Sequence, residues 1–355
     1  MAYTTINKSG DYFNTKLYTG NGSAGNGITG VGFQPDFTWI KNRDGAYWHQ
    51  TYDAVRGASA GALYTNQTAA QDYMGGNGLA SFNSDGFTVN TNDGCNGNGQ
   101  DLVAWNWKAN GAGSANTAGT INSTVSVNTT AGFSIVSYTG NGTGGATVGH
   151  GLGVAPSMII EKGRSVTDDW LIYHKSIGAT KGLALNNTTA EAASSGYWND
   201  TAPTSSLFTI GNNGKVNTNG GTHVAYCFAE KTGYSKFGSY TGNGNADGTF
   251  VYTGFKPAFV ILKTSNLTGG WYIKDSIRSG GTNPNGSNPN ETDNPTANTS
   301  NAENKASAFG MDILSNGFKL RATDGYVNFD GGNYIYMAFA EAPLVGTNGV
   351  TAKAR

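Results

Sequence analysis

The sequence predicts an all-β protein made of three tandem antiparallel β-sandwiches of the jelly-roll kind. A Tyr-Thr-Gly-Asn-Gly motif occurs three times, at residues 18–22, 138–142 and 240–244. Short apolar runs alternate with turns rich in Gly and Asn, a pattern typical of β-hairpins. No window of the sequence combines the apolar spacing and the capping residues of an amphipathic helix. We therefore expect about seven short strands per hundred residues, three times over.

The same series of segments follows each copy of the motif. In the first copy, Gly-Phe-Gln-Pro (32–35) precedes a predicted strand, and a segment that begins with Trp48 comes next. The corresponding segments begin with Trp170 and Trp271. Each series closes with a strand in which large and small side chains alternate, so we expect the large ones to share a core-facing side. These closing strands are 102–108, 224–230 and 335–341.

The repeats also predict where the domains begin and end. The expected segments are an N-terminal arm (1–11), repeat 1 (12–110), a linker or strand-like arm (111–130), repeat 2 (131–231), repeat 3 (235–343) with a loop insertion (280–304), and a C-terminal tail (344–355). The alternative to three sandwiches in series is one compact body with pseudo-threefold symmetry.

Composition excludes several classes of protein. A net charge of −1 with 13% charged residues argues against nucleic-acid binding, which needs clustered Lys and Arg. No apolar run reaches the roughly 20 residues of a membrane helix, so membrane insertion is not expected. The first residues lack the apolar core of a secretory signal, so we expect synthesis in a cytoplasm. There, Cys95 and Cys227 are either free thiols or, alternatively, a disulfide.

Charged pairs at corresponding positions are one candidate for chemistry. Asp53 is followed by Arg56 and Asp275 by Arg278, whereas repeat 2 is aligned with Lys175 and Gly178 at these positions. A local turn or ion pair of small energetic value explains such a pair. A catalytic role would have to survive its loss from one repeat.

The sequence predicts no metal site and no other cofactor. The histidines lack the spacing of metal ligands. They are His49, His150, His174 and His223. Residues 92–101 are similar to a calcium loop but lack its final bidentate acid, so a plain turn is the other interpretation.

Aromatic residues in polar loops are the strongest signal for ligand binding. Tyr197, Trp198, Asn199 and Asp200 lie in one loop of repeat 2, where repeat 1 has Tyr73. An exposed ring beside amide and carboxylate groups suits the face of a sugar. The alternative is that Trp198 plugs the end of the sandwich.

Taken together, the motifs resemble a domain of unknown function common in virion proteins of tailed phages. The segments that carry the resemblance most closely are 18–22, 32–41, 48–57, 83–89 and 103–109. The resemblance implies a concanavalin-like or SPRY-like sandwich and a place on a phage particle, such as a tail fibre, tail tip or capsid surface. It implies no catalytic residues, and repeat 2 departs from the pattern at the Asp and Arg positions.

We therefore expect a non-enzymatic virion structural protein, foremost a tail fibre or tail-associated protein that binds a host cell-surface glycan. The alternatives are a capsid decoration protein without a host ligand and a polysaccharide depolymerase. A depolymerase needs two carboxylates across a cleft, for which Asp168, Asp169 and Asp200 are available. The protein would be made in the host cytoplasm and displayed on the particle among other virion proteins. Assembly as a homo-oligomer, foremost a trimer, would strengthen weak glycan contacts.

Overall fold

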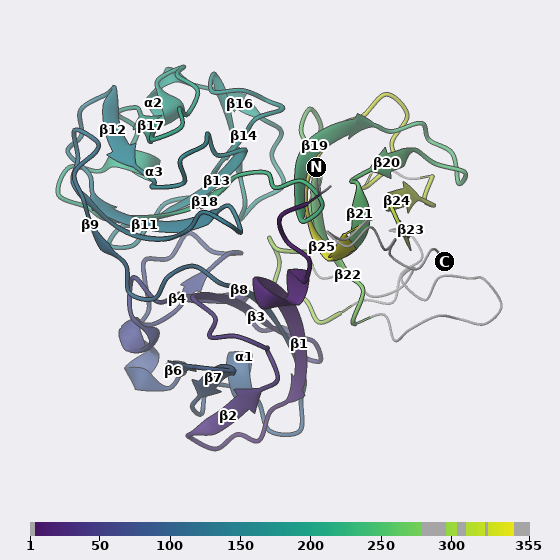
Figure 1. Ribbon diagram of the computed structural model, residues 1–355, viewed down its shortest axis with the longest axis horizontal. Helices are drawn as coiled ribbons and strands as arrows, with labels where there is room; N and C mark the ends of the chain where they lie inside the picture. The colour runs from purple at the N-terminus through teal and green to yellow at the C-terminus, as the bar shows by residue number, and fades with distance from the viewer. Residues whose placement is uncertain (1–3, 279–295, 304–309, 324–325, 344–355) are drawn as a thin grey trace.

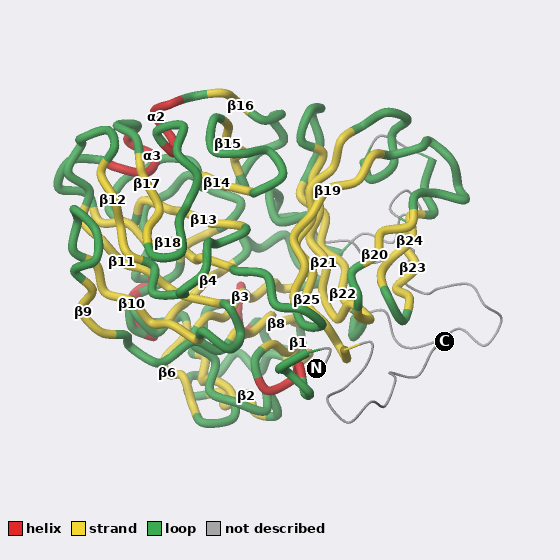
Figure 2. Tube along the Cα trace, turned by 45° about the horizontal axis from the view of Figure 1, so that its top comes forward, coloured by secondary structure: helices red, strands yellow, loops and turns green. Residues whose placement is uncertain are grey.

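The all-β prediction is confirmed by a computed structural model, which describes residues 4–278, 296–303, 310–323 and 326–343. Strands make up 43% of the structure and helices 7%. Figure 2 shows how few helical segments there are among the strands and loops. Most of the predicted insertion at 280–304 and all of the predicted tail at 344–355 lie outside the described residues.

The strands form three groups, which we call units 1, 2 and 3 (Figure 1). Unit 1 contains β1 (Phe13–Thr19), β2 (Asn26–Thr29), β3 (Phe37–Asn42), β4 (Gln50–Asp53), β5 (Leu63–Tyr64), β6 (Leu79–Asn83), β7 (Gly86–Val89), α1 (Asp93–Asn96) and β8 (Asp101–Trp107). Unit 2 contains β9 (Ser114–Asn116), β10 (Ser123–Asn128), β11 (Phe133–Thr139), β12 (Ala146–Gly149), β13 (Met158–Gly163), β14 (Leu171–His174), β15 (Lys181–Ala184), β16 (Ala192–Ala193), α2 (Ser195–Trp198), β17 (Leu207–Ile210), α3 (Gly214–Asn217) and β18 (Thr222–Phe228). Unit 3 contains β19 (Ser235–Thr241), β20 (Phe250–Tyr252), β21 (Phe255–Thr264), β22 (Trp271–Asp275), β23 (Met311–Leu314), β24 (Gly317–Leu320) and β25 (Asn333–Pro343). Short 3-10 turns lie at Ser9–Asp11, Ala58–Ala60 and Met74–Gly76.

Each unit pairs a large sheet with a small one. The large sheets have the strand orders β1-β8-β3-β4-β5, β16-β15-β14-β13-β18-β11-β10-β9 and β19-β25-β21-β22. The small sheets are β2-β7-β6, β12-β17 and β20-β24-β23. In every large sheet the closing strand (β8, β18 or β25) lies between the opening strand and the strand that follows the Pro. The register aligns the three sheets residue by residue, because Phe37 pairs with Trp107, Met158 with Phe228, and Phe259 with Phe339.

The inner strands of the large sheets are buried on both faces, and the two faces meet different cores. Small residues such as Ala104, Ala225 and Ala338 face the small sheet of their own unit. The large residues of the same strands face a central core that contains side chains from all three units. Trp107, Phe228 and Phe339 meet there, with ring centroids 5.7 Å, 5.9 Å and 6.3 Å apart. The protein is therefore one compact body around a shared core, the arrangement given above as the alternative to sandwiches in series.

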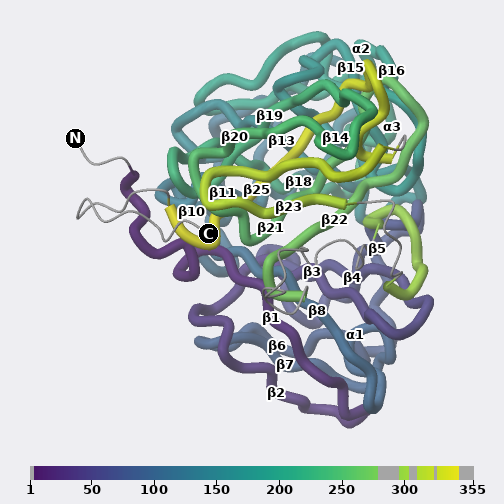
Figure 3. The backbone as a smooth tube through the Cα atoms, turned by 90° about the vertical axis from the view of Figure 1, so that its right-hand side faces the viewer, coloured from purple at the N-terminus to yellow at the C-terminus, as the bar shows by residue number. Residues whose placement is uncertain are grey.

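Hydrogen bonds between the units close this body into a ring. The backbone N–H of Gln71 in unit 1 donates to Arg164 O in unit 2, at 2.8 Å. The backbone N–H of Glu191 in unit 2 donates to Ser265 O in unit 3, at 2.7 Å. The backbone N–H of Glu303 in unit 3 donates to Arg43 O in unit 1, at 2.8 Å. We call these contacts the 1–2, 2–3 and 3–1 junctions. Figure 3 shows unit 1 below units 2 and 3 in a side view.

The Tyr-Thr-Gly-Asn-Gly motif holds a turn to the start of the closing strand. In unit 1 the Tyr18 hydroxyl donates to Cys95 O, and the Asn21 N–H donates to Oδ1 of the buried Asn96. A side chain on Gly20 would place a Cβ only 2.2 Å from Gly97 O, so glycine is required there. The other units repeat both bonds: Tyr138–Val216 and Asn141–Asn217, then Tyr240–Val327 and Asn243–Asn328. The motif is therefore explained by folding.

The segments outside the predicted repeats also belong to the body. Residues 111–130 include β9 and β10, which extend the large sheet of unit 2 next to β11. The strand-like arm, rather than a free linker, describes this segment. In the N-terminal arm, Ile6 is buried in the central core.

Three buried lysines occupy corresponding positions at the ends of their strands: Lys41, Lys162 and Lys263. Their ammonium groups donate to backbone carbonyls, in two cases across a junction: Lys162 to Thr68 O and Lys263 to Thr188 O. Burial lowers the pKa of each of the three lysines to about 8. The unfolded chain, with an ordinary lysine pKa near 10.4, then binds the extra proton between these two pH values. These lysines should make stability rise with pH in that window.

We predict that Lys162→Met removes part of this pH dependence. Between pH 8 and pH 10 the free energy of unfolding of the wild type should rise by about 2 kcal/mol relative to the variant, because only the wild type gains from deprotonating Lys162 in the folded state. Urea unfolding at several pH values measures the difference. Lys8→Met is the control, since the Lys8 side chain is exposed. Parallel curves for wild type and Lys162→Met would show that Lys162 titrates normally.

Candidate functional site

The Asp and Arg pairs are buried contacts between units. The Asp53 carboxylate binds Arg56 at 2.5 Å and accepts a hydrogen bond of 2.7 Å from the Tyr226 hydroxyl of unit 2. Asp275 binds Arg278 in the same way and accepts from Trp105 Nε1 of unit 1 at 2.9 Å. The prediction of a local turn and ion pair is confirmed, because each Arg lies three residues after its Asp and its backbone N–H also donates to that carboxylate. The expected small energetic value is wrong, because these side chains are buried at the junctions.

The alignment of repeat 2 at these positions was wrong by one residue. Sheet register places His174, not Lys175, at the position of Asp53, and Ile177, not Gly178, at the position of Arg56. His174 Nε2 lies 3.2 Å from Tyr336 O of unit 3. The residue after Tyr336 is Met337, which corresponds to Tyr226 and Trp105 but has no strong donor. His thus replaces the Asp in unit 2, whose neighbour, unit 3, has no side-chain donor for a carboxylate at this position.

The residues considered for metals and disulfides lie apart. Within the described ranges no group of three His, Cys, Asp or Glu side chains is placed to hold a metal ion. The segment 92–101 contains helix α1, whose N-terminal cap is Asn92. Cys95 and Cys227 are free thiols buried in the separate cores of units 1 and 2. Asp169, one of the carboxylates considered for hydrolysis, is bound by Lys215.

The residues of the predicted sugar-binding loop differ in their exposure to solvent. Trp198 is only 1% exposed and packs against the Tyr173 ring, so it plugs the end of the unit 2 sandwich and offers no face to a ligand. Tyr197 is half-buried against the same core, while Asn199 and Asp200 are exposed in left-handed conformations. Tyr73, 61% exposed, lies in unit 1 and is not beside this loop in sequence or sheet. Ligand binding by the exposed residues stays a prediction.

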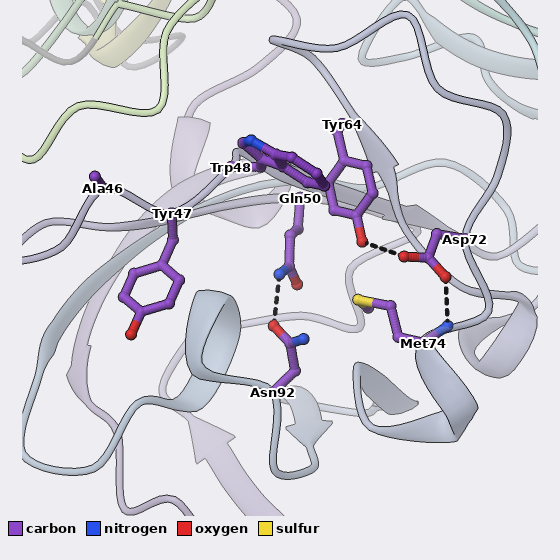
Figure 4. A pocket seen from close by; sticks show the side chains of 8 residues that line it. All are labelled: Ala46, Tyr47, Trp48, Gln50, Tyr64, Asp72, Met74 and Asn92. Atoms are coloured by element: carbon purple, nitrogen blue, oxygen red, sulfur yellow. Dashed lines mark hydrogen bonds between the residues drawn. The ribbon is translucent and has the colours of Figure 1, made fainter. Parts of the chain in front are cut away.

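A pocket of about 420 Å³ lies on unit 1, and its lining includes Asp72 and Met74, the neighbours of Tyr73 in the sequence. Its lining residues come from the segment before β4, from β4 and β5, and from the loops before β6 and α1 (Figure 4). They are Ala46, Tyr47, Trp48, Gln50, Tyr64, Asp72, Met74 and Asn92. The pocket therefore combines three aromatic rings with two amides and one carboxylate.

The aromatic side of this pocket is formed by Trp48 and Tyr64. Trp48 is 45% exposed, and its ring packs edge-on against Tyr64 with centroids 4.9 Å apart. The Tyr64 hydroxyl donates to Asp72 Oδ2 at 2.8 Å, and the Met74 N–H donates to Asp72 Oδ1 at 2.8 Å. Burial and the bond to Asp72 raise the pKa of Tyr64, so its hydroxyl stays a donor at neutral pH. The Asp72 carboxylate is thus held in place from both oxygens.

A chain of polar groups lies opposite. The Tyr52 hydroxyl donates to Gln50 Oε1 at 2.6 Å, and Gln50 Nε2 donates to Asn92 Oδ1 at 2.7 Å. Asn92 Nδ2 has no hydrogen-bond partner among the described residues, which leaves a donor for a ligand. Met74, on the rim, has a φ of +53°, a left-handed conformation that is unfavourable for a side chain of this size. Such backbone strain is found preferentially at functional sites.

Sequence reasoning missed Trp48 because it was aligned with the wrong residues. The register places His49, not Trp48, at the position of Trp170 and Trp271. Both of those tryptophans donate across a junction, Trp170 to Tyr64 O and Trp271 to Ala184 O. The signal was in the spacing: Trp48 precedes Asp53 by five residues, but Trp170 precedes His174 by four. One extra residue turns Trp48 outward.

Other side chains occupy the corresponding place in unit 2. Trp198 packs on Tyr173, which corresponds to Tyr52 beneath the unit 1 pocket. Asp72 corresponds to Ala192, and Trp48 to Asp169, whose carboxylate binds Lys215. At this place unit 2 has a buried Trp and an ion pair, whereas unit 1 has the pocket.

A comparison with known protein families matches residues 8–343 to DUF7483, a domain of unknown function. The chain belongs to the DUF7483 family. No curated protein and no solved structure matches it. The DUF7483 match spans all three units. The predicted domain boundaries stay a prediction. None of the described helices of this DUF7483 member is long and apolar enough to cross a membrane.

Proposed function

We propose that this protein is a non-enzymatic carbohydrate-binding protein of a phage particle, and that the unit 1 pocket is its glycan site. The observation that carries the proposal is the exposed Trp48 ring at the mouth of a pocket whose other groups are amides, hydroxyls and one carboxylate. The C–H groups of a sugar ring pack on an indole face, while its hydroxyls need fixed donors and acceptors.

The chemistry of the lining supports binding rather than cleavage. Glycoside hydrolysis uses two carboxyl groups across the scissile bond. Asp72 is the single carboxylate among the lining residues, and both of its oxygens already accept hydrogen bonds. The place on a phage particle, as a tail-associated receptor-binding protein, is supported by the sequence resemblance. A homo-oligomer on the virion surface would add avidity to a single modest site.

We predict that Trp48→Ala lowers the affinity for a bound glycan roughly tenfold or more, since loss of the ring contact removes on the order of 1.4 kcal/mol. An array of bacterial surface polysaccharides identifies the glycan, and titration with wild type and variant measures the loss. Tyr252→Ala is the matched control, because Tyr252 is a 54% exposed aromatic residue on unit 3, away from the pocket. Equal affinities of Trp48→Ala and wild type would remove the site. A polysaccharide that becomes shorter during the incubation would remove the non-enzymatic part of the proposal.

A further inference from the structure

A second pocket, of about 320 Å³, lies at the 2–3 junction. Its lining includes Ile177, Lys181 and Glu191 from unit 2 and Ser239, Ser265 and Asn333 from unit 3. Ser239 and Asn333 are exposed at its rim, while Ser265 is buried. The other two junctions show what fills this space elsewhere in the molecule.

At the 1–2 junction the corresponding space holds a guanidinium group. Arg164, at the position of Ser265, donates through Nε to Gln71 Oε1 at 3.0 Å and through Nη1 to Ser137 Oγ at 3.1 Å. Arg56, at the position of Ile177, lies close enough to lower the pKa of Arg164 after the larger effect of burial. Two arginines thus occupy this junction.

The 3–1 junction holds two arginines as well. Arg43, also at the position of Ser265, donates through Nε to Glu303 Oε2 at 2.7 Å. Arg278, at the position of Ile177, donates through Nη1 to Glu303 Oε1 at 2.7 Å. One carboxylate therefore takes a cation on each of its oxygens at this place in the fold.

The 2–3 junction has lost both arginines, and His174 replaces the Asp that binds Arg56 and Arg278 in the other units. It has kept acceptors at the positions that bind Arg164 and Arg43. Glu191 stands where Gln71 and Glu303 stand at the other junctions, and its backbone makes the same inter-unit hydrogen bond. Ser239 corresponds to Ser137, which accepts from Arg164. Ser265 and Ile177 are too short to reach these acceptors, and the pocket is the space that remains.

We propose that the 2–3 pocket binds a guanidinium group, supplied either by a small guanidinium compound or by an arginine side chain of a partner protein. The acceptors are the Glu191 carboxylate and the Ser239 hydroxyl. Lys181 binds Glu191 Oε1 at 2.5 Å, but within the described residues nothing binds Oε2. The arrangement around Glu303 shows that two cations fit on one carboxylate here, so Lys181 and the guanidinium can bind together. A planar group with several donors satisfies both acceptors at once, which an alkylammonium ion cannot do as well.

Titration calorimetry of the full chain with methylguanidinium and with methylammonium tests the proposal. We expect methylguanidinium to bind at least tenfold more tightly. Ser265→Arg should abolish this binding, because the new side chain fills the pocket as Arg164 and Arg43 do at the other junctions. Ser84→Arg is the control, since it adds the same charge at an exposed turn of unit 1. Glu191→Gln should weaken binding at least tenfold and keeps the test valid if Ser265→Arg fails to fold.

A blocked Gly-Arg-Gly peptide separates the two sources of the group. Binding of the peptide as tightly as methylguanidinium supports an arginine of a partner protein, and binding of methylguanidinium alone supports a small compound. The proposal is overturned if wild type binds neither probe, if methylammonium binds equally well, or if Glu191→Gln and folded Ser265→Arg bind like wild type.

Discussion

Replacing Asp53 by alanine is expected to destabilise the protein by about 3–5 kcal/mol, because it leaves a buried guanidinium without its counter-charge. Both Asp53 and Arg56 have fully buried side chains. Burial alone would lower the pKa of Arg56, but the neighbouring Asp53 carboxylate raises it instead, so the arginine stays charged. Its other donors bind the carbonyls of Gly61 and Thr51, which cannot replace a negative charge. Urea unfolding of the variant measures the loss.

Two further variants separate this effect from an ordinary ion-pair loss. Asp11→Ala removes the partner of Lys8 in an exposed pair and should cost at most about 1 kcal/mol. Tyr226→Phe removes the donor from unit 2 and should cost about 1 kcal/mol, the value of one hydrogen bond. If Asp53→Ala costs no more than Asp11→Ala, the pair is not the buried junction contact described above.

The strands were predictable because their signal is local. Period-two alternation and Gly or Asn turns can be recognised from consecutive residues. They predicted the all-β class and the closing strands. The same alternation could not show which face meets which core. Trp105 and Ala104 lie on opposite faces of β8, and both are fully buried, one in the central core and the other within unit 1. An alternation of large and small apolar residues does not distinguish these two environments.

The closed ring of three units could not be predicted from the sequence, for a different reason. Its contacts join residues far apart in the sequence, 87 positions for Trp271 and Ala184 and 260 positions for Arg43 and Glu303. Many of them use backbone carbonyls, such as Tyr64 O and Ala184 O, which any residue supplies. The change from Asp to His174 in unit 2 becomes intelligible only next to Met337 of unit 3, where the donor is missing. A departure from a repeat pattern can thus compensate for a change in the neighbouring unit.

The candidate site shows the same limit at a smaller scale. Sequence reasoning chose an aromatic residue in a polar loop, which is a reasonable signal, but it could not tell an exposed ring from a buried one. Trp198 is buried on Tyr173, whereas Trp48 is exposed because one extra residue precedes its strand. The pocket itself is assembled from β4, β5 and the loops before β6 and α1, and only folding brings these together.

Exchanging the buried pair of Glu161 and His223 for the residues of unit 1 is expected to stabilise the protein. Both side chains are fully buried, and His223 Nδ1 lies 2.7 Å from Glu161 Oε1. Among the described residues, Glu161 Oε2 and His223 Nε2 have no hydrogen-bond partner. Burial raises the pKa of Glu161 even though His223 opposes that shift. A half-satisfied polar pair of this kind is worse than apolar packing.

Unit 1 provides the replacement, since Ile40 and Leu102 occupy the corresponding positions. Glu161→Ile with His223→Leu should raise the free energy of unfolding by about 1–4 kcal/mol, as for other buried ion pairs replaced by apolar residues. His223→Leu alone should lower it by about 3–5 kcal/mol, because the buried Glu161 then keeps only the long hydrogen bond of 3.4 Å from the Tyr138 hydroxyl. Glu161→Ile alone should cost less, about 1–3 kcal/mol, since it leaves one buried imidazole nitrogen without its hydrogen bond and no buried carboxyl group. Urea unfolding of all four proteins gives the coupling free energy directly. A double variant less stable than either single variant would show that the pair itself is the better solution at this position.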